Sequence, residues 1–343
     1  MSNKFEKIVA QVSSKVFERE EEIGILLTTI IAGYNAVMIG NAGTAKSMLA
    51  TEVLKHFAGQ KYHSLLHPFS EPSDLLGELD LRAMKHGRRI RNTANTLVEA
   101  DYAFLDEIFK ARSTTLTALL QLLNERIYVE EGQAREIPLK GVIGASNEFC
   151  DDESGAIADR FRVYLPIFNL GEKLGRSIER LWQDHEEYDR EMIEAPFINV
   201  CRKKMKKILK KQGTSIFSSL IEINKKFVEQ GASELSDRSL IQCCEMIAMS
   251  AVLSKRSEVS LSDYNVVKYM AKDFDIDAPI YTQVVNDFAS SNVIVDALEA
   301  NIRKAKSKSS LAKLLTDLDN KSLPFYMTIR IKKSIKLKLD SLG

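Results

Sequence analysis

The chain is poor in the residues that mark several common classes of protein. Its 343 residues include only four cysteines and five histidines. The cysteines (Cys150, Cys201, Cys243 and Cys244) show no C-x-x-C spacing, which predicts reduced cytosolic thiols that mostly fill the core. No two histidines stand four residues apart with a carboxylate between them, which argues against a metal-hydrolase site.

Net charge and long apolar runs are also lacking. The 48 basic and 47 acidic residues leave a formal charge of +1, so no overall field favours nucleic acid or a membrane. The longest apolar stretch, residues 23–40, is interrupted by Thr28, Thr29, Tyr34 and Asn35 and is too polar to span a bilayer. The N-terminal segment has no apolar core followed by a small-residue cleavage site. We therefore expect a cytoplasmic protein.

The pattern of apolar residues changes near residue 172. Before it, four short apolar runs predict buried strands, at residues 36–40, 102–107, 140–149 and 160–168. Helical spacing covers 5–33 in two pieces, 47–58 and 113–127, the last with Ser113 or Thr114 as the expected cap. Residues 126–139 predict a hairpin around Gly132. This alternation predicts a parallel α/β sheet with helices on both faces.

After residue 172 the strand patterns stop, and helix-like segments predict an all-α region. Four of these segments are 171–184, 205–213, 215–231 and 237–255. We expect Trp182 and the stretch from Met246 to Met249 to belong to a helical core. The last part is basic, with eleven Lys or Arg against three Asp from Arg303 onward. The chain thus divides into 1–172, 173–274 and 275–343.

The segment AVMIGNAGTAKSMLA, residues 36–50, nearly matches the phosphate-loop pattern G-x-x-x-x-G-K-[ST]. In that pattern backbone N–H groups surround phosphate oxygens, the lysine reaches the β- and γ-phosphates, and the hydroxyl binds Mg²⁺. Gly40, Gly43, Lys46 and Ser47 match, whereas Ala45 replaces the second glycine. We expect Ala45 in the first helical turn, where alanine is acceptable, so the loop should keep its shape. The alternative is an ordinary strand–turn–helix with a chance Lys-Ser pair.

Two acids end the second predicted strand, at the edge of the sheet where open α/β proteins bind ligands. Asp106 is predicted to hold Mg²⁺ and its water shell, and Glu107 to act as general base on the attacking water. The alternative is a pair of solvated carboxylates at the start of a loop. The phosphate-loop pattern about 60 residues upstream makes that alternative less favourable.

Further polar residues extend the candidate site. Asn147 ends the third strand pattern, where its amide could hold the attacking water or the γ-phosphate; a turn residue is the alternative. Arg160 and Arg162 precede the fourth strand, and a planar guanidinium suits the charge on a transferring phosphoryl group. The alternative is two surface arginines. Ser236 is an expected helix cap, and the charge of Arg238 in the first turn opposes the helix dipole, which suggests a phosphate partner.

The motifs GNAGTAKS, FLDE, ASNE, ADRF and SDR, in this order and spacing, resemble the MoxR family of AAA+ ATPases, and its RavA-like branch in particular. FSEPSDLLG (69–77), FLDEIFKA (104–111) and NER (124–126) add to the resemblance, which covers about residues 15–270. It implies an α/β P-loop AAA+ core, residues 1–172, with a parallel sheet flanked by helices. An all-α lid domain (173–274) and a helical basic C-terminal segment (275–343) would follow.

The resemblance also implies a role for each site residue. Asp106 and Glu107 correspond to Walker B, Asn147 to sensor 1, Arg160 to an arginine finger acting in trans, and Arg238 to sensor 2. Ser47 and Asp106 would hold Mg²⁺. The residues expected to contact ATP are Val16 and Phe17 beside the adenine, the Walker A stretch Gly40, Asn41, Ala42, Gly43, Thr44, Ala45, Lys46, Ser47 and Met48, and Arg238.

Partners and assembly come from the resemblance as well. The family implies a homo-oligomeric ring, a hexamer, that remodels protein clients, often proteins with a von Willebrand factor A (vWA) domain. Residues 80–96 resemble the helix-2 insert and 126–139 the hairpin before sensor 1, both of which face the pore of such rings. Two departures stand out. SDRS replaces the SDRR or SPRR of sensor 2, and the long C-terminal extension of RavA is not evident.

Two other functions stay open. A nucleic-acid motor would use the basic stretch 201–211 and the basic tail, although these are also typical of a solvated helix face and no stacking aromatics interleave with them. A nucleotide-gated scaffold with little hydrolysis is the other alternative. Glu107 and Arg160 argue against that scaffold.

Overall fold

The computed structural model describes residues 2–148, 155–171, 189–273, 275–289, 291–305, 307–319 and 321–342. The chain forms two compact units. The sheet unit comprises Gly33–Glu172 with Met192–Glu194, and the helical unit comprises Met1–Ala32, Lys173–Glu191 and Ala195–Gly343. These units differ from the three predicted domains, since residues before Gly33 and after 274 both belong to the helical unit. The division at 172 and 274 stays a prediction.

A five-stranded parallel sheet forms the centre of the sheet unit, in the order β2-β3-β6-β1-β7. The central strands β1 (Ala36–Ile39) and β6 (Gly141–Ser146) are buried at every position, as their unbroken apolar runs predicted. β3 (Tyr102–Asp106) and β7 (Val163–Pro166) also lie where predicted. The predicted parallel α/β fold is therefore confirmed.

One strand of the sheet, β2 (Lys61–Leu65), was not predicted from the sequence. Its residues KYHSL alternate between exposed and half-buried positions, and β2 is an edge strand with β3 (Tyr102–Asp106) as its neighbour. A short strand of this kind carries no apolar run. Its pattern is therefore hard to distinguish from that of a polar loop.

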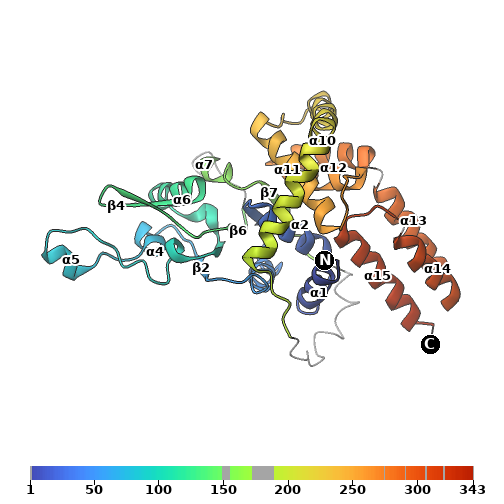
Figure 1. The fold of residues 1–343 in the computed structure, drawn as a ribbon, viewed down its shortest axis with the longest axis horizontal. Helices are drawn as coiled ribbons and strands as arrows, with labels where there is room; N and C mark the ends of the chain where they lie inside the picture. Colours follow the sequence, from blue (N-terminus) through green and yellow to red (C-terminus); the bar gives the residue numbers. More distant parts are fainter. Residues whose placement is uncertain are drawn as a thin grey trace. The chain divides into compact units, whose positions relative to one another are not determined.

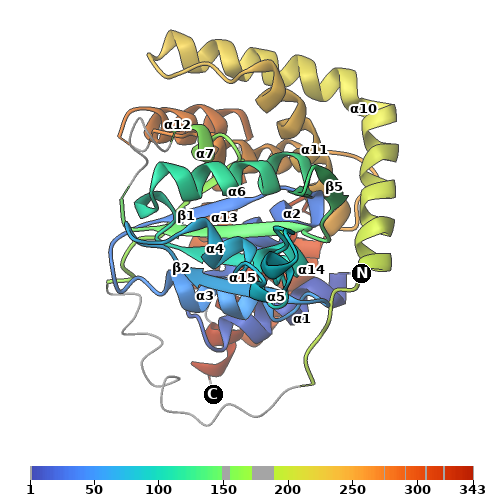
Figure 2. The ribbon, with the colours of Figure 1, turned by 90° about the vertical axis from the view of Figure 1, so that its left-hand side faces the viewer.

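Helices cover both faces of the sheet. α3 (Lys46–Leu54) lies on one face and α6 (Ser113–Glu125) on the other (Figure 2). The predicted cap of α6 is wrong, because Arg112 occupies the N-cap position and no side chain caps the helix. The remaining short elements of this unit are α4 (Pro72–Leu76), α5 (Leu81–Lys85), α7 (Gly155–Ala158) and the 3-10 turns at Leu97–Glu99 and Ile108–Lys110.

The predicted hairpin is present as β4 (Ile127–Glu130) and β5 (Gln133–Glu136), with Gly132 in the turn. It contacts residues 77–95, which we call the arm and which carry α5 at their far end (Figure 1). Carboxylates of the hairpin turn accept hydrogen bonds from arm backbone N–H groups, Glu131 from Arg89 and Glu130 from Arg91, both at 2.6 Å. The arm and the hairpin are thus joined at their ends.

The helical unit is all-α in its described residues, as predicted. A single helix, α10 (Ala195–Glu229), runs through Gly213, where the sequence predicted two helices. One glycine costs about 1 kcal/mol in a helix, which packing against α11 (Asp237–Leu253) outweighs. Cys243, Cys244 and the Met246–Met249 stretch are buried in α11, as expected. The predicted helix 171–184, with Trp182, lies outside the described residues apart from Gly171.

The C-terminal part of the helical unit packs on its N-terminal part. The remaining elements are α1 (Ser2–Ser13), α2 (Glu20–Ala32), the 3-10 segment η3 (Leu261–Met270), α12 (Asp277–Ala289), α13 (Ser291–Lys304), α14 (Lys308–Asp319) and α15 (Phe325–Asp340). α15 contacts α1 and α2, with Phe325, Ile331 and Ile335 buried. Among the described residues, none of the helices combines the length and apolar character needed to cross a membrane.

Candidate functional site

The loop between β1 and α3, residues 40–45, lies at the carboxyl edge of the sheet. Gly40 cannot carry a side chain, because a Cβ there would lie 2.1 Å from the carbonyl oxygen of Ile167. Gly43 has a φ of +80°, a conformation that glycine adopts without strain. Within the described chain, the N–H groups of residues 41–45 donate no backbone hydrogen bond. They are therefore available to an anion, and their predicted contact with phosphate stays a prediction.

Ala45 departs from its predicted conformation. We expected it in the first helical turn, but it precedes α3 with φ 66° and ψ 25°, in the left-handed region. Steric contact between Cβ and the following carbonyl makes that region cost roughly 1–2 kcal/mol for a residue with a side chain. The loop therefore keeps its turn at the cost of local strain, and not because alanine suits a helix.

Lys46, the first residue of α3, turns its ammonium group back under the loop. Nζ donates to the carbonyl oxygens of Gly40 (2.6 Å) and Asn41 (2.9 Å), and to Oδ1 of Asn147 (2.7 Å). The residue is buried, and this burial lowers its pKa, against the opposing effect of the Glu107 and Asp106 charges. A buried ammonium beneath a ring of amides is suited to bind phosphate.

Ser47 and Asp106 come together from α3 and the end of β3. The Ser47 hydroxyl donates to Oδ2 of Asp106 at 2.6 Å. A hydroxyl and a carboxylate are the oxygen ligands that Mg²⁺ prefers, so the two residues fit the metal that the sequence predicted here. Met48 lies next to them in α3 and is 46% exposed.

Glu107 and Asn147 are also brought together. The side-chain N–H of Asn147 donates to Oε1 of Glu107, and its backbone N–H lies 3.4 Å from Oε2. Asn147 thus bridges the ammonium of Lys46 and the carboxylate of Glu107. Lys110, which sequence reasoning did not select, forms an ion pair with Glu107 at 3.3 Å. Its only signal was a cation three residues after the acid in FLDEIFKA.

Arg160 lies at the opposite edge of the sheet. β1 and β7 are parallel, with Ala36 opposite Val163 and Ile39 opposite Pro166. The loop 40–45 follows β1, whereas Arg160 precedes β7, so the length of a four-residue strand, about 13 Å, lies between them. Arg162 is buried, whereas Arg160 is partly exposed. The Arg160 side chain is therefore not part of the cluster around Lys46.

The other predicted contacts belong to the helical unit. Val16 and Phe17 are buried in the segment between α1 and α2. Arg238 is exposed in the first turn of α11, and Ser236 caps that helix by accepting from the N–H of Ser239, as predicted. Their predicted roles beside adenine and phosphate stay predictions.

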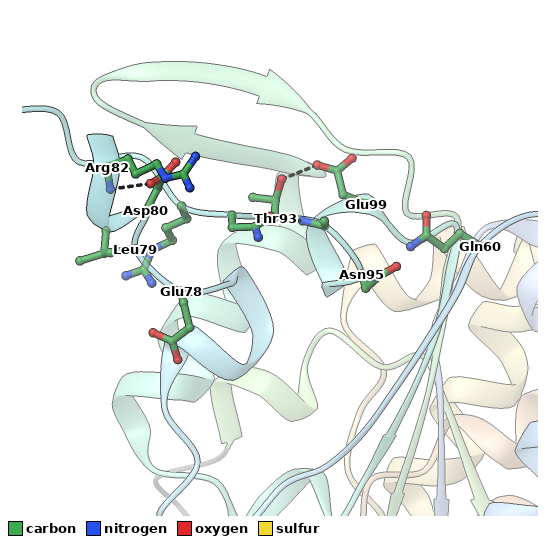
Figure 3. A pocket seen from close by; sticks show the side chains of 11 residues that line it. Gln60, Glu78, Leu79, Asp80, Arg82, Thr93, Asn95 and Glu99 are labelled. Carbon is green, nitrogen blue, oxygen red and sulfur yellow. Dashed lines mark hydrogen bonds between the residues drawn. The ribbon is translucent and has the colours of Figure 1, made fainter. Parts of the chain in front are cut away.

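A concavity of about 880 Å³ lies between the arm and the start of β2 (Figure 3). Its lining is mostly polar and includes Asp80, Arg91 and Glu99. Thr93 donates to Glu99 at 2.6 Å, and Arg135 also donates to Glu99, at 2.7 Å. These contacts lower the pKa of Glu99, the Arg135 hydrogen bond most strongly. None of the predicted site residues lines this concavity.

Comparison with known families and structures agrees with this geometry. Residues 3–209 match the family described as the MoxR domain in the MoxR-vWA-beta-propeller ternary systems, and residues 215–284 match an AAA lid domain. The fold is similar to the crystal structure of a proposed ATPase from Cytophaga hutchinsonii. That likeness has a TM-score of 0.62 at 16% identity and covers 84% of this chain and 94% of that one.

Two curated relatives are uncharacterized proteins of Methanocaldococcus jannaschii. One is 32% identical over 84% of this chain and 75% of its own length, and the other 30% identical over 87% and 82%. The MoxR domain match covers more than half of the chain and includes every residue of the cluster around Lys46. The chain therefore belongs to the MoxR family of AAA+ proteins.

Proposed function

We propose that this protein binds ATP with Mg²⁺ and hydrolyses it to ADP and phosphate. The observation that supports this most directly is the cluster at the carboxyl edge of the sheet. There Lys46 contacts Asn147, Asn147 contacts Glu107, and Ser47 contacts Asp106. A phosphate cradle, a pair of metal ligands and a carboxylate base are the parts that hydrolysis of a triphosphate requires.

Each residue of the cluster has a chemical role in this proposal. The amides of 41–45 and Lys46 hold the phosphates. Ser47 and Asp106 would hold Mg²⁺, which neutralises phosphate charge when bound. Glu107 accepts a proton from the attacking water. Asn147 holds the carboxylate of Glu107 toward the phosphate site.

The arginine that completes the site comes from another copy of the chain. Because Arg160 lies a strand's length away from the loop 40–45 of its own sheet, it is poorly placed to reach its own nucleotide. A ring in which each subunit offers Arg160 to its neighbour resolves this, and we propose a hexamer. An arginine finger of this kind is worth about 10³–10⁵ in rate.

We further propose that the ring remodels protein clients with a vWA domain. The support is the matching family, whose description places its MoxR domains in systems with vWA and β-propeller partners. The finer RavA-like assignment rests on the motifs of residues 40–47, 69–77, 104–111 and 124–126. A genomic neighbour that encodes a vWA protein, or recovery of such a protein with the tagged chain, would test the client.

A Glu107→Gln variant tests the chemistry. It should bind ATP and assemble like the natural chain, with turnover reduced at least 100-fold. Glu222→Gln, on the exposed surface of α10, is the matched control and should keep full turnover. Full hydrolysis by Glu107→Gln would remove Glu107 as the base, and failure of the natural chain to bind millimolar ATP would end the proposal.

A further inference from the structure

Asn35 makes four hydrogen bonds at the amino edge of the sheet, one residue before β1. Its side-chain Nδ2 donates to the carbonyl oxygen of Arg160 at 3.0 Å. Oδ1 accepts from the N–H of Val142 (3.1 Å) and from Nη2 of Arg126 (3.0 Å). The backbone carbonyl of Asn35 accepts from the N–H of Arg162 at 2.9 Å. One buried side chain thus joins segments that are far apart in the sequence.

The chemistry of these partners requires an asparagine. The oxygen of the amide faces two donors and its nitrogen faces a carbonyl, so both ends of the group are matched. Aspartate would keep the two acceptor contacts but would turn an oxygen toward the Arg160 carbonyl. A buried amide that satisfies three partners in different segments fixes their backbone positions relative to one another.

Two of the four bonds hold the segment that carries Arg160. Asn35 binds the carbonyl of Arg160 and the N–H of Arg162, and the N–H of Arg160 donates to Ile157 at 3.0 Å. The backbone is thus fixed on both sides of the Arg160 side chain. Within the described part of the chain, the buried Nε of its guanidinium has no hydrogen-bond partner and stays available to a ligand.

Arg126 connects this network to the hairpin. It is the last residue of the NER motif and ends α6 with a φ of 55°, immediately before β4. Its guanidinium binds Asn35, and its carbonyl accepts from the N–H of Ile137 at 2.8 Å. The NER motif therefore places the Arg126 cation against the side chain of Asn35, which in turn holds the Arg160 segment.

We propose that Asn35 is a positioning residue for Arg160, which it holds through the Arg160 carbonyl and the Arg162 amide with support from Arg126. This inference rests on the proposed function, in which Arg160 acts on the nucleotide of a neighbouring subunit. A fixed backbone is what such a role needs, because displacement of a reacting group by about 1 Å can reduce a rate about 100-fold.

The first test is Asn35→Asp, with Asn35→Ala as a second variant that introduces no charge. We expect kcat to fall about 10- to 100-fold, while KM for ATP stays within about threefold. KM should stay because the substitution leaves the phosphate contacts of Lys46 and Ser47 unchanged. Asn224→Ala is the matched control, because Asn224 is a buried asparagine of the helical unit that binds Leu235 and Glu234. It should lose stability but not turnover per folded chain.

Mixed assemblies separate positioning from general structural damage. An Asn35→Asp subunit has an intact nucleotide site but offers a displaced Arg160. A Glu107→Gln subunit has an inactive site but offers a normal Arg160. Mixing the two should restore turnover at the sites of Asn35→Asp subunits, to at least fivefold above either variant alone. A Glu107→Gln and Arg160→Ala mixture measures the trans action of Arg160 by itself.

The outcomes distinguish the two proposals. One outcome is that turnover recovers when Glu107→Gln is mixed with Arg160→Ala but not when it is mixed with Asn35→Asp or Asn35→Ala. That result would overturn the inference and leave the proposed function standing. Full turnover by both Asn35 variants alone would also overturn it. If neither mixture recovers, the trans action of Arg160 fails and the role of Asn35 fails with it.

Discussion

At the scale of single residues, Ala45 is a strained position of loop 40–45, with a φ of 66°. The sequence pattern has glycine there, and the alanine adopts the left-handed conformation that glycine favours. Nothing in the letters NAGTAKS distinguishes a helical alanine from a left-handed one. The difference comes from the turn that loop 40–45 must complete before α3 begins.

Ala45→Gly should raise the free energy of unfolding by about 0.5–1 kcal/mol, because relief of left-handed strain exceeds the added flexibility of the unfolded chain. Chemical denaturation would measure this. Ala50→Gly, in the buried middle of α3, is the control and should lower stability by about 1 kcal/mol. If Ala45→Gly lowered the free energy of unfolding as much as Ala50→Gly does, the inferred strain at Ala45 would be wrong.

The buried ammonium of Lys46 predicts a pH dependence of nucleotide binding. Burial lowers its pKa below the ordinary lysine value of 10.5, so its charge is lost at a lower pH than that of an exposed lysine. Affinity for an ATP analogue should therefore weaken on the alkaline side, before an exposed lysine would titrate. Lys46→Arg, which stays charged, should remove this fall. An affinity for the natural chain that is constant to pH 10.5 would contradict the prediction.

At the scale of elements, residues with strong local patterns were predictable and those fixed by distant neighbours were not. Unbroken apolar runs predicted β1, β3, β6 and β7, and the spacing of GNAGTAKS and FLDE predicted which side chains would meet. β2 was missed because an edge strand needs no apolar run. Lys110 and Asn35 were missed as site residues because their importance arises only from contacts that folding creates.

The contact between hairpin and arm gives a prediction at this scale. Glu130→Ala with Glu131→Ala removes the acceptors of the Arg89 and Arg91 N–H groups, each worth about 1–2 kcal/mol. Hydrogen exchange at those amides should become about tenfold faster. Glu136→Ala, exposed on β5, serves as the control and should leave the exchange unchanged. Unchanged exchange in the double variant would show that the arm is held by other contacts.

At the scale of the whole molecule, three cations of the basic tail have partners that the sequence did not reveal. Lys333 of α15 forms ion pairs with Glu18 and Glu20, and Lys332 lies 3.7 Å from Glu6. Arg330 pairs with Glu299 of α13 at 2.9 Å. These tail cations have partners within the helical unit, which supports an internal packing role over binding of nucleic acid.

Lys333→Met should destabilise the chain by about 2 kcal/mol, because Glu20 is buried and would lose its cation. Lys336→Met, an exposed position on the same helix, should change stability by less than about 0.5 kcal/mol. Thermal unfolding of both variants checks this. Equal effects would mean that the ion pairs of α15 contribute little.

The discontinuous helical unit has a consequence for biosynthesis. α15, which packs on α2, follows it from the ribosome on the order of tens of seconds later at ordinary elongation rates. The sheet unit is almost continuous in sequence and can mature during that interval. The nascent chain therefore exposes the face of α2 that α15 covers until α15 has been synthesised, and ribosome-associated chaperones can bind that face in the interval.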